Sequence, residues 1–361
     1  MNTNPGGIPP RPGVRAPARG ASINPTGRFE KQIILPDPDY LDPDAPHPKT
    51  QFFQDSASSL ITFNDSPDIS FEASLNIYRG CEHGCSYCYA RPFHEYLGFS
   101  AGLDFESKIF VKTDAPSLLR SELLSKRWKP RVVVMSGVTD CYQPAERYFK
   151  LTRACLEIFA EFKNPVSIIT KSALVTRDIP ILQRLAHCDS VQVFVSVTTL
   201  DRELARAMEP RAPTPEHRLR AIEELNRAGI PVGVMAAPMI PGLTDHELPA
   251  ILKAAAEAGA RTAGYVVLRL PHGVKEIFSD WMDRHHPSKK NRVLSRLRQL
   301  RGGKLYDSTW GERGTGTGIF ADQLKQLFEV NTRRLGLNRN RMNLSTSQFC
   351  RPGGEEQLSL L

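Results

Sequence analysis

The chain has 361 residues, 40% of them hydrophobic, and its 47 basic and 39 acidic residues leave a formal net charge of +8. This length and composition indicate a globular protein with one large core or two modest ones. No run approaches the ~20 apolar residues that span a bilayer, and the N-terminus lacks the apolar segment of a secretion signal, so we expect a cytoplasmic protein without membrane contact. The positive charge permits a polyanionic partner without identifying one.

The first 50 residues are rich in proline and poor in aromatic side chains. Such a segment buries too little apolar surface to offset the entropy of ordering it. We therefore expect a disordered, proline-rich arm over residues 1–50.

Six strand patterns alternate with helix patterns between residues 75 and 269. The strands are expected at 75–78, 131–135, 166–170, 190–197, 231–236 and 264–269. The helices between them are expected at 115–127, 145–162, 179–186, 215–228 and 245–258. Gly229 and Gly259 stand where glycine C-caps would end two of these helices.

Several of these strands, such as 132–135, are nearly all apolar, which is typical of parallel strands that helices cover on both faces. Six strand–helix units are too few to close an eight-stranded barrel. The predicted fold is therefore α/β, a partial (βα)6 TIM-type barrel of parallel strands over residues 51–270. Ligands of such sheets bind at the carboxyl ends of the strands.

After residue 269 only helix patterns remain, and they predict a helical C-terminal extension over residues 271–361. The helices are expected at 274–284, 287–300 and 320–335. The second has apolar residues along one face, while Arg292, Arg296 and Arg298 face outward. These arginines fit phosphate contacts with a nucleic acid, and they fit a solvated basic face equally well.

Three of the seven cysteines stand together directly after the first predicted strand, in the run LNIYRGCEHGCSYCYA over residues 75–90. Thiolates are the usual ligands of iron–sulfur clusters, and a glycine-containing loop allows Cys81, Cys85 and Cys88 to reach one cluster. Three ligands leave one iron of a four-iron cluster open, as in catalytic metal sites. The alternative is a zinc site that adds His83 or His94, although the spacing departs from paired C-x-x-C motifs.

The pattern C-x-x-x-C-x-aromatic-C, formed here by Cys81, Cys85, Tyr87 and Cys88, resembles the signature of the radical S-adenosylmethionine (radical SAM) superfamily. The resemblance implies a [4Fe-4S] cluster on the three cysteines, with the amino and carboxylate groups of S-adenosyl-L-methionine bound to the open iron. It implies an enzyme that cleaves this cofactor reductively to methionine and a 5'-deoxyadenosyl radical, which abstracts hydrogen from a substrate. A reductase or a flavodoxin- or ferredoxin-type protein would supply the electron.

Between Cys81 and about Asp245 the sequence resembles the spore photoproduct lyase-like group, which is described as related to DNA repair photolyases. Six patches carry this resemblance: CYA, SGVTDCYQPAE, ITKS, SVTTLD, MEPRAPTPEHRL and AAPMIPGLTD. The resemblance implies an enzyme of the lyase or oxidoreductase type, and it makes a nucleic acid one candidate substrate.

The same resemblance implies which side chains contact the cofactor. Tyr87 would pack on its adenine side and Tyr89 would orient it beside the cluster, although either ring could instead belong to the core. Lys171 would meet the cofactor carboxylate, and Ser196 would hydrogen-bond to the carboxylate or the ribose. Ala237 is small enough for adenine to lie against the backbone.

Four further candidates follow strands two and four. Thr139 and Asp140 would lie near the amino end of the cofactor. Glu209 and Arg218 fit two arrangements equally well, an interior ion pair and a clamp on the cofactor carboxylate.

Cys141 is the candidate catalytic residue, because a thiol just past the second strand could return a hydrogen atom to a product radical. The alternative is a small buried thiol in the core. Two other functions stay open from the sequence: an iron–sulfur electron-transfer or sensor protein that does not cleave the cofactor, and a nucleic-acid-binding protein with a structural zinc site.

Overall fold

Short apolar runs of the chain form six parallel strands at the centre of the molecule. The computed structural model describes residues 7–8, 19–29, 48–68, 71–339 and 343–352. The parallel strands are β4 (Ala73–Leu75), β7 (Val133–Met135), β8 (Val166–Thr170), β9 (Val191–Ser196), β10 (Val232–Met239) and β11 (Thr262–Val267). They pair in chain order, and the antiparallel strand β3 (Ile61–Phe63) lies beside β4 at the edge.

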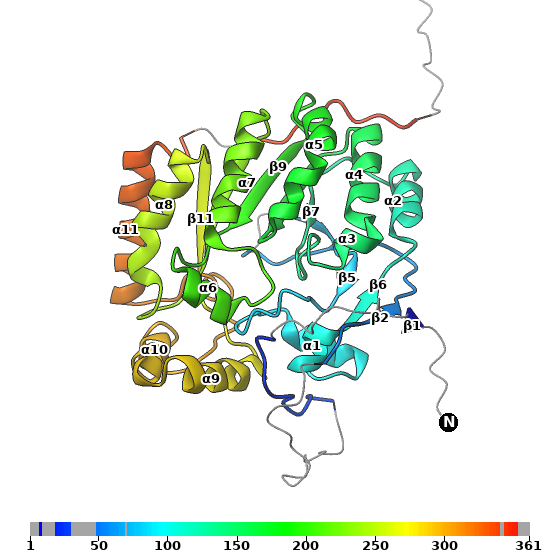
Figure 1. Cartoon of the computed structure of the whole chain (residues 1–361). Coiled ribbons are helices and arrows are strands. Elements are labelled where there is room, and N and C mark those ends of the chain that lie inside the picture. The colour runs from blue at the N-terminus through cyan, green and yellow to red at the C-terminus, as the bar shows by residue number, and fades with distance from the viewer. Residues whose placement is uncertain (1–6, 9–18, 30–47, 69–70, 340–342, 353–361) are drawn as a thin grey trace, which may run out of the picture.

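The two end strands of the parallel part, β4 and β11, do not pair with each other among the described residues. The sheet is therefore an open partial barrel, which confirms the predicted fold. Helices line one face of the sheet (Figure 1). They are α2 (Ala115–Leu124), α3 (Glu146–Phe149), α4 (Leu151–Phe162), α5 (Ile179–Ala186), α7 (Pro215–Arg227) and α8 (Leu248–Glu257).

Local sequence signals explain where these helices begin and end. Prolines stand in the first turn of α2, α5, α7 and α8, where a missing N–H costs no hydrogen bond. Gly229 follows α7 with a φ of 77°, in the left-handed region that favours glycine. The helix expected over 145–162 is divided into α3 and α4, because Lys150 between them has a φ of 55°. Short 3-10 helices η3 (Ala173–Asp178) and η4 (Asp245–Glu247) precede α5 and α8.

A second, smaller sheet supports the cysteine-rich segment. Its order is β1 (Gly7–Ile8), β2 (Gln51–Gln54), β6 (Lys108–Val111), β5 (Tyr78–Arg79). The chain leaves β5 directly into Cys81 and returns through the 3-10 helix η2 (Arg91–Leu97) and α1 (Leu103–Ser107) to β6. No strand pattern in the sequence predicts this sheet.

The predicted C-terminal extension is helical, with α9 (Val274–His285), α10 (Pro287–Gln299) and α11 (Ile319–Leu335). Buried side chains of α9 and α10 form one hydrophobic cluster with Cys85, Tyr87 and residues of α6 (Arg202–Met208). Trp281 of α9 is fully buried and donates from Nε1 to the carbonyl of Ala207 at 2.9 Å. The extension and the barrel thus share a core on both sides of the predicted boundary at residue 270.

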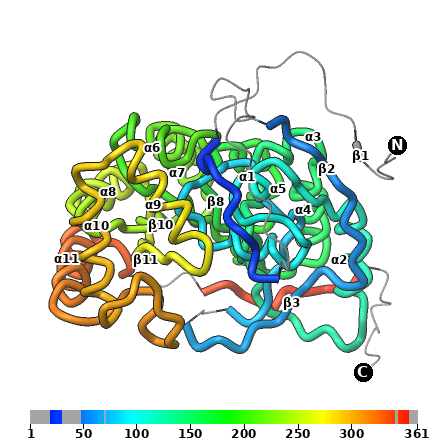
Figure 2. The backbone as a smooth tube through the Cα atoms, turned by 90° about the horizontal axis from the view of Figure 1, so that it is seen from below, coloured from blue at the N-terminus to red at the C-terminus, as the bar shows by residue number. Residues whose placement is uncertain are grey.

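Residues 19–29 lie packed on the protein, although we expected a disordered arm there. In Figure 2 this segment is the blue tube that crosses the face of the molecule. Arg19 is 6% exposed and Ala21 is 1% exposed. The expectation is therefore wrong for these residues, and most of the remaining arm lies outside the described residues.

Among the described residues, no helix combines the length and the apolar character that crossing a membrane would require.

Candidate active site

The segment from Cys81 to Cys88 is wound into consecutive tight turns. The amide of Gly84 donates to the carbonyl of Cys81 at 3.3 Å, and the amide of Cys88 donates to the carbonyl of Cys85 at 3.2 Å. Gly84 has a φ of 67°, and a Cβ there would lie 2.7 Å from a carboxylate oxygen of Glu106, so this turn requires glycine. We call residues 81–88 the cysteine loop.

The three cysteines of the loop face a common region. Cys88 packs against two hydrophobic clusters of side chains, one that contains Cys85 and one that contains Cys81. Burial raises the pKa of the Cys81 thiol well above its ordinary value, and Asp140 and the other two thiols of the loop raise it further. Burial also raises the pKa of Cys85, to about 12, although Lys171 opposes the shift.

These residues fit an iron–sulfur cluster. The three thiols are free and two of them are buried, and positively charged iron would stabilise their thiolate forms. Among the described residues, no three His, Cys, Asp or Glu side chains meet closely enough to hold a single metal ion. A cuboidal cluster does not need such a meeting point, because each cysteine binds a different iron.

The two histidines considered for zinc lie in different surroundings. His83 Nδ1 lies 3.4 Å from a carboxylate oxygen of Asp140. The His94 ring packs against Phe99, Phe105 and Phe110 at centroid distances of 5.6, 5.7 and 5.9 Å.

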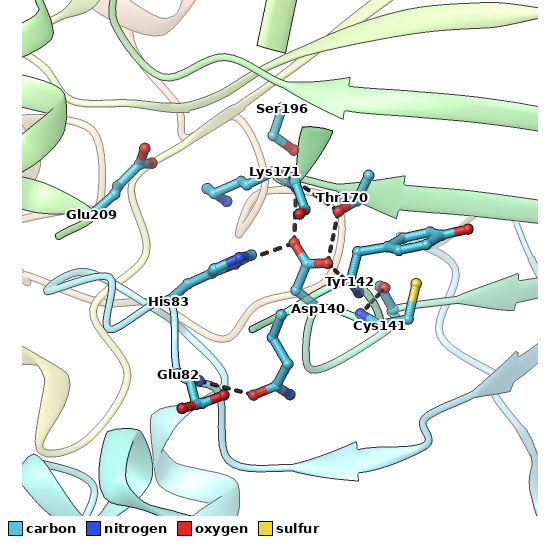
Figure 3. Close-up of polar contacts among 12 residues, drawn as sticks. Glu82, His83, Asp140, Cys141, Tyr142, Thr170, Lys171, Ser196 and Glu209 are labelled. Atoms are coloured by element: carbon cyan, nitrogen blue, oxygen red, sulfur yellow. Dashed lines mark hydrogen bonds and ion pairs between the residues drawn. The ribbon is translucent and has the colours of Figure 1, made fainter. Parts of the chain in front are cut away.

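Asp140 connects the cysteine loop to the carboxyl end of β8 (Figure 3). Its carboxylate accepts from Thr170 Oγ1 at 2.7 Å and from the amide of Lys171 at 2.8 Å, and it faces His83. Burial alone would raise the pKa of Asp140, but His83 and the hydrogen bonds lower it to about 2. Because protein donors occupy both oxygens, Asp140 holds the loop in place. Thr139 is likewise occupied, since its hydroxyl donates to the carbonyl of Tyr78 at 2.6 Å.

Tyr87 is fixed by a buried ion pair. Its hydroxyl donates to Glu209, whose other carboxylate oxygen pairs with Arg218. Thr198 Oγ1 also donates to Glu209, at 2.8 Å. Burial alone would raise the pKa of Glu209, but Arg218 and Lys171 outweigh it and hold that pKa at about 2. The interior ion pair is thus the arrangement present, and it orients a tyrosine of the cysteine loop.

Lys171 and Ser196 lie next to each other above Asp140 in Figure 3. The ammonium of Lys171 is 5.8 Å from the centroid of the Tyr87 ring. Burial would lower its pKa, but Cys85 and Glu209 outweigh this and raise it, so the lysine stays charged. No Asp or Glu among the described residues forms an ion pair with it. An ammonium group at the end of β8 that forms no ion pair with a described carboxylate is suited to a carboxylate ligand.

Two further candidates border the same region. The carbonyl oxygen of Ala237, in β10, lies 3.1 Å from Thr198 Oγ1. Tyr89 is 40% exposed, and its hydroxyl donates to the carbonyl of Gly137 beyond β7 at 2.8 Å. The guanidinium of Arg269 lies 5.3 Å from the centroid of the Tyr89 ring.

Cys141 directly follows Asp140 and lies in the main core. Its side chain is 3% exposed and belongs to the largest hydrophobic cluster. Burial raises its pKa well above the ordinary value, and Asp140 raises it further. Its carbonyl accepts from Thr152 Oγ1 at 2.6 Å.

The sequence analysis missed several residues that support the loop. Gln143 is fully buried and spans it, accepting from the amide of Glu82 at 2.9 Å and donating to the carbonyl of Gly80 at 3.1 Å. Arg91 and Glu106 form a fully buried ion pair directly behind the loop. Gln143 lies within the patch SGVTDCYQPAE, so its position was noticed but not its role.

Comparisons with known proteins bear on this site. The family model described as "Radical SAM superfamily" matches residues 75–255, which run from the end of β4 into α8 and include the cysteine loop. This chain belongs to the radical SAM superfamily. An uncharacterized protein of Mycobacterium tuberculosis is 38% identical over 245 residues, which is 67% of this chain and 71% of that protein. A radical SAM Nα-GlyT isomerase of Pseudomonas phage M6 is 26% identical over 168 residues, covering 46% of this chain and 33% of the isomerase.

Among solved structures, spore photoproduct lyase complexed with dinucleoside spore photoproduct matches with a TM-score of 0.57 and 16% identity. The match covers 79% of this chain and 80% of that one. At this identity the likeness establishes the radical SAM fold, a partial barrel of parallel strands. Members of the radical SAM superfamily use S-adenosylmethionine and a four-iron, four-sulfur cluster.

Proposed function

We propose that this chain is a radical SAM enzyme whose Cys81, Cys85 and Cys88 hold a [4Fe-4S] cluster. The single observation that carries the proposal is a loop of three neighbouring, free thiols that hydrogen bonds and ion pairs hold at the carboxyl ends of parallel strands. The bound cluster and S-adenosyl-L-methionine supply a 5'-deoxyadenosyl radical for hydrogen abstraction from the substrate.

The chain's own residues orient the cofactor and exclude water. Lys171, charged and without an acidic partner, receives the cofactor carboxylate beside Ser196. Tyr87, held by Glu209, and Tyr89, held by Gly137, line the space next to the cluster. Ala237 leaves room for adenine against β10. For Cys141, its place in the main core favours packing over hydrogen donation.

The substrate class we propose is nucleic acid, and the reaction is of the lyase or oxidoreductase type. The structural neighbour is complexed with a dinucleoside photoproduct, and this chain carries a net charge of +8. A reductase or a flavodoxin- or ferredoxin-type protein would provide the electron.

The test is anaerobic reconstitution followed by dithionite and S-adenosylmethionine. We expect iron and sulfide in the protein, a cubane absorption and release of methionine and 5'-deoxyadenosine. Changing Cys81, Cys85 and Cys88 together to Ala should abolish all of these, whereas Cys188→Ala, outside the loop, should preserve them. A cluster without deoxyadenosine release would instead indicate an electron-transfer or sensor protein. Zinc without sulfide would indicate the structural zinc site.

A further inference from the structure

Two arginines lie near each other past the carboxyl end of the sixth parallel strand. Arg269 follows β11, and Arg301 follows α10. Burial lowers the pKa of Arg301, and the positive charge of Arg269 lowers it further. Among the described residues, neither guanidinium forms an ion pair with a carboxylate.

Their hydrogen-bond donors are largely unused. Arg301 is 3% exposed, and its Nη2 donates to the carbonyl of Leu268 at 3.0 Å. Nε and Nη1 of Arg301 and Nε of Arg269 are buried and have no acceptor within the described part of the chain. Buried N–H groups without acceptors are costly and therefore rare in folded proteins.

Two fully buried arginines elsewhere in the molecule have carboxylate partners, whereas the buried Arg19 donates to the backbone carbonyls of Glu106 and Pro48. Arg91 pairs with Glu106, and Arg218 pairs with Glu209. All four of these side chains are buried. The pair Arg269 and Arg301 differs because no carboxylate of the described residues forms an ion pair with it, and the nearby Asp307, whose charge raises the pKa of Arg301, pairs with Lys304 at 3.6 Å. Two guanidinium groups without a contacting carboxylate are the arrangement of a site for an external oxyanion.

Arg269 also borders the proposed reaction centre. The Arg269 guanidinium lies over the ring of Tyr89, the residue that directly follows Cys88. Lys171, on the β8 side, interacts electrostatically with the same tyrosine. The region therefore has a cation for the cofactor carboxylate on one side and two unpaired arginines on the other.

We infer that Arg269 and Arg301 bind a phosphate group of the substrate, an inference that rests on the proposed function. One guanidinium fork is sufficient for a planar carboxylate, whereas two forks match the several oxygens of a tetrahedral phosphate. The phosphate belongs either to a nucleic-acid backbone or to a small phosphorylated molecule. In both cases the arginines position the substrate beside Tyr89.

The experiment is calorimetric titration of the cluster-loaded, full-length protein with inorganic phosphate under anaerobic conditions. We expect saturable binding that Arg269→Gln and Arg301→Lys each weaken at least about tenfold, as loss of a charge-assisted pair does. Arg301→Lys removes the guanidinium fork but keeps the buried positive charge, so weaker binding by this variant is not explained by loss of folding. The matched control is Arg227→Gln, because the side chain of Arg227 is 72% exposed on α7 and should not affect phosphate.

Three results would overturn the inference: no phosphate binding by the wild-type protein, acetate binding as tight as phosphate binding, or competition between phosphate and S-adenosylmethionine. The last would assign the arginines to the cofactor. Deoxyadenosine release without substrate, measured on the wild type and on Arg227→Gln, tests the proposed function separately, and both proteins should show it.

The source of the phosphate is then tested by competition. An oligonucleotide without terminal phosphates that displaces inorganic phosphate identifies the nucleic-acid backbone. Displacement only by a mononucleotide 5'-phosphate identifies a small phosphorylated substrate. If neither displaces phosphate, the site does not serve the substrate and the inference fails.

Discussion

His94 is a histidine that the fold keeps neutral. It is 1% exposed, and neither ring nitrogen has a hydrogen-bond partner within the described residues. Burial lowers its pKa from 6.5 to about 4. Between these two pH values the unfolded chain binds a proton at His94 that the folded protein does not bind. The contribution of His94 to the free energy of unfolding is therefore complete above about pH 6.5 and falls as the pH drops toward 4.

We predict that His94 accounts for up to about 3 kcal/mol of stability lost between pH 7 and pH 4. His94→Phe, which fits a pocket of phenylalanine rings, should reduce that loss by the same amount, as measured by urea unfolding at several pH values. The exposed His217→Gln is the control. An unchanged pH profile in His94→Phe would contradict the prediction.

Site residues could be predicted from the sequence where they belong to a local motif or stand at the end of a predicted strand. Cys81, Cys85 and Cys88 stand in one motif, and Lys171 and Ser196 stand at strand ends. Arg269 and Arg301 could not be paired in advance, because 32 residues separate them and they meet only through the turn after α10. The missing counter-charge is a property of the folded molecule.

The segment 19–29 behaves as an additional element of the site. The amides of Gly20 and Ala21 donate to the two carboxylate oxygens of Glu106 at 3.0 and 2.8 Å. Arg19 donates to the backbone carbonyl of the same residue at 2.6 Å. A Cβ on Gly20 would lie 1.7 Å from the carbonyl oxygen of Gly84 in the cysteine loop.

We therefore predict that Gly20→Ala destabilises the protein by about 2 kcal/mol, because the added methyl group must push the segment off the loop. The variant should also lose iron faster than the wild type during anaerobic dialysis. Gly314→Ala is the control, since nothing lies within 4 Å of a Cβ there. Equal melting temperatures and iron contents in the two variants would show that the segment does not support the loop.

Elements with a strong pattern were predicted closely. Strand β8 and helix α5 have the expected bounds, 166–170 and 179–186. The small sheet was missed because its strands are two to four residues long and lack a clear apolar alternation. Proline content misled the analysis at residues 19–29, where tertiary hydrogen bonds to Glu106 order the backbone.

At the scale of the whole molecule, the cysteines of the loop pack into hydrophobic clusters that also contain other elements. One hydrophobic cluster joins Cys85 to α9 and α10, and another joins Cys81 to Phe105 of α1. An iron–sulfur cluster bound by these cysteines would therefore stabilise the barrel, the small sheet and the extension together. Binding to the folded state alone contributes about 2.7 kcal/mol at a hundredfold excess over the dissociation constant.

We predict that removal of the iron with a chelator lowers the melting temperature by several degrees, measured by anaerobic calorimetry. The variant with all three cysteines changed to Ala should melt at one temperature with or without chelator. If the wild type also melts at the same temperature after complete iron removal, the cluster and the fold are not coupled in this way.

The hydrogen bonds of Glu106 have a practical consequence for anyone who divides this protein into fragments. Similarity to the superfamily begins at residue 75. A protein that started there would lack Gly20 and Ala21, whose amides donate to the buried carboxylate of Glu106. The ion pair with Arg91 would then open to water behind the cysteines. The homology boundary is therefore not the folding boundary, and expression should start upstream of Arg19.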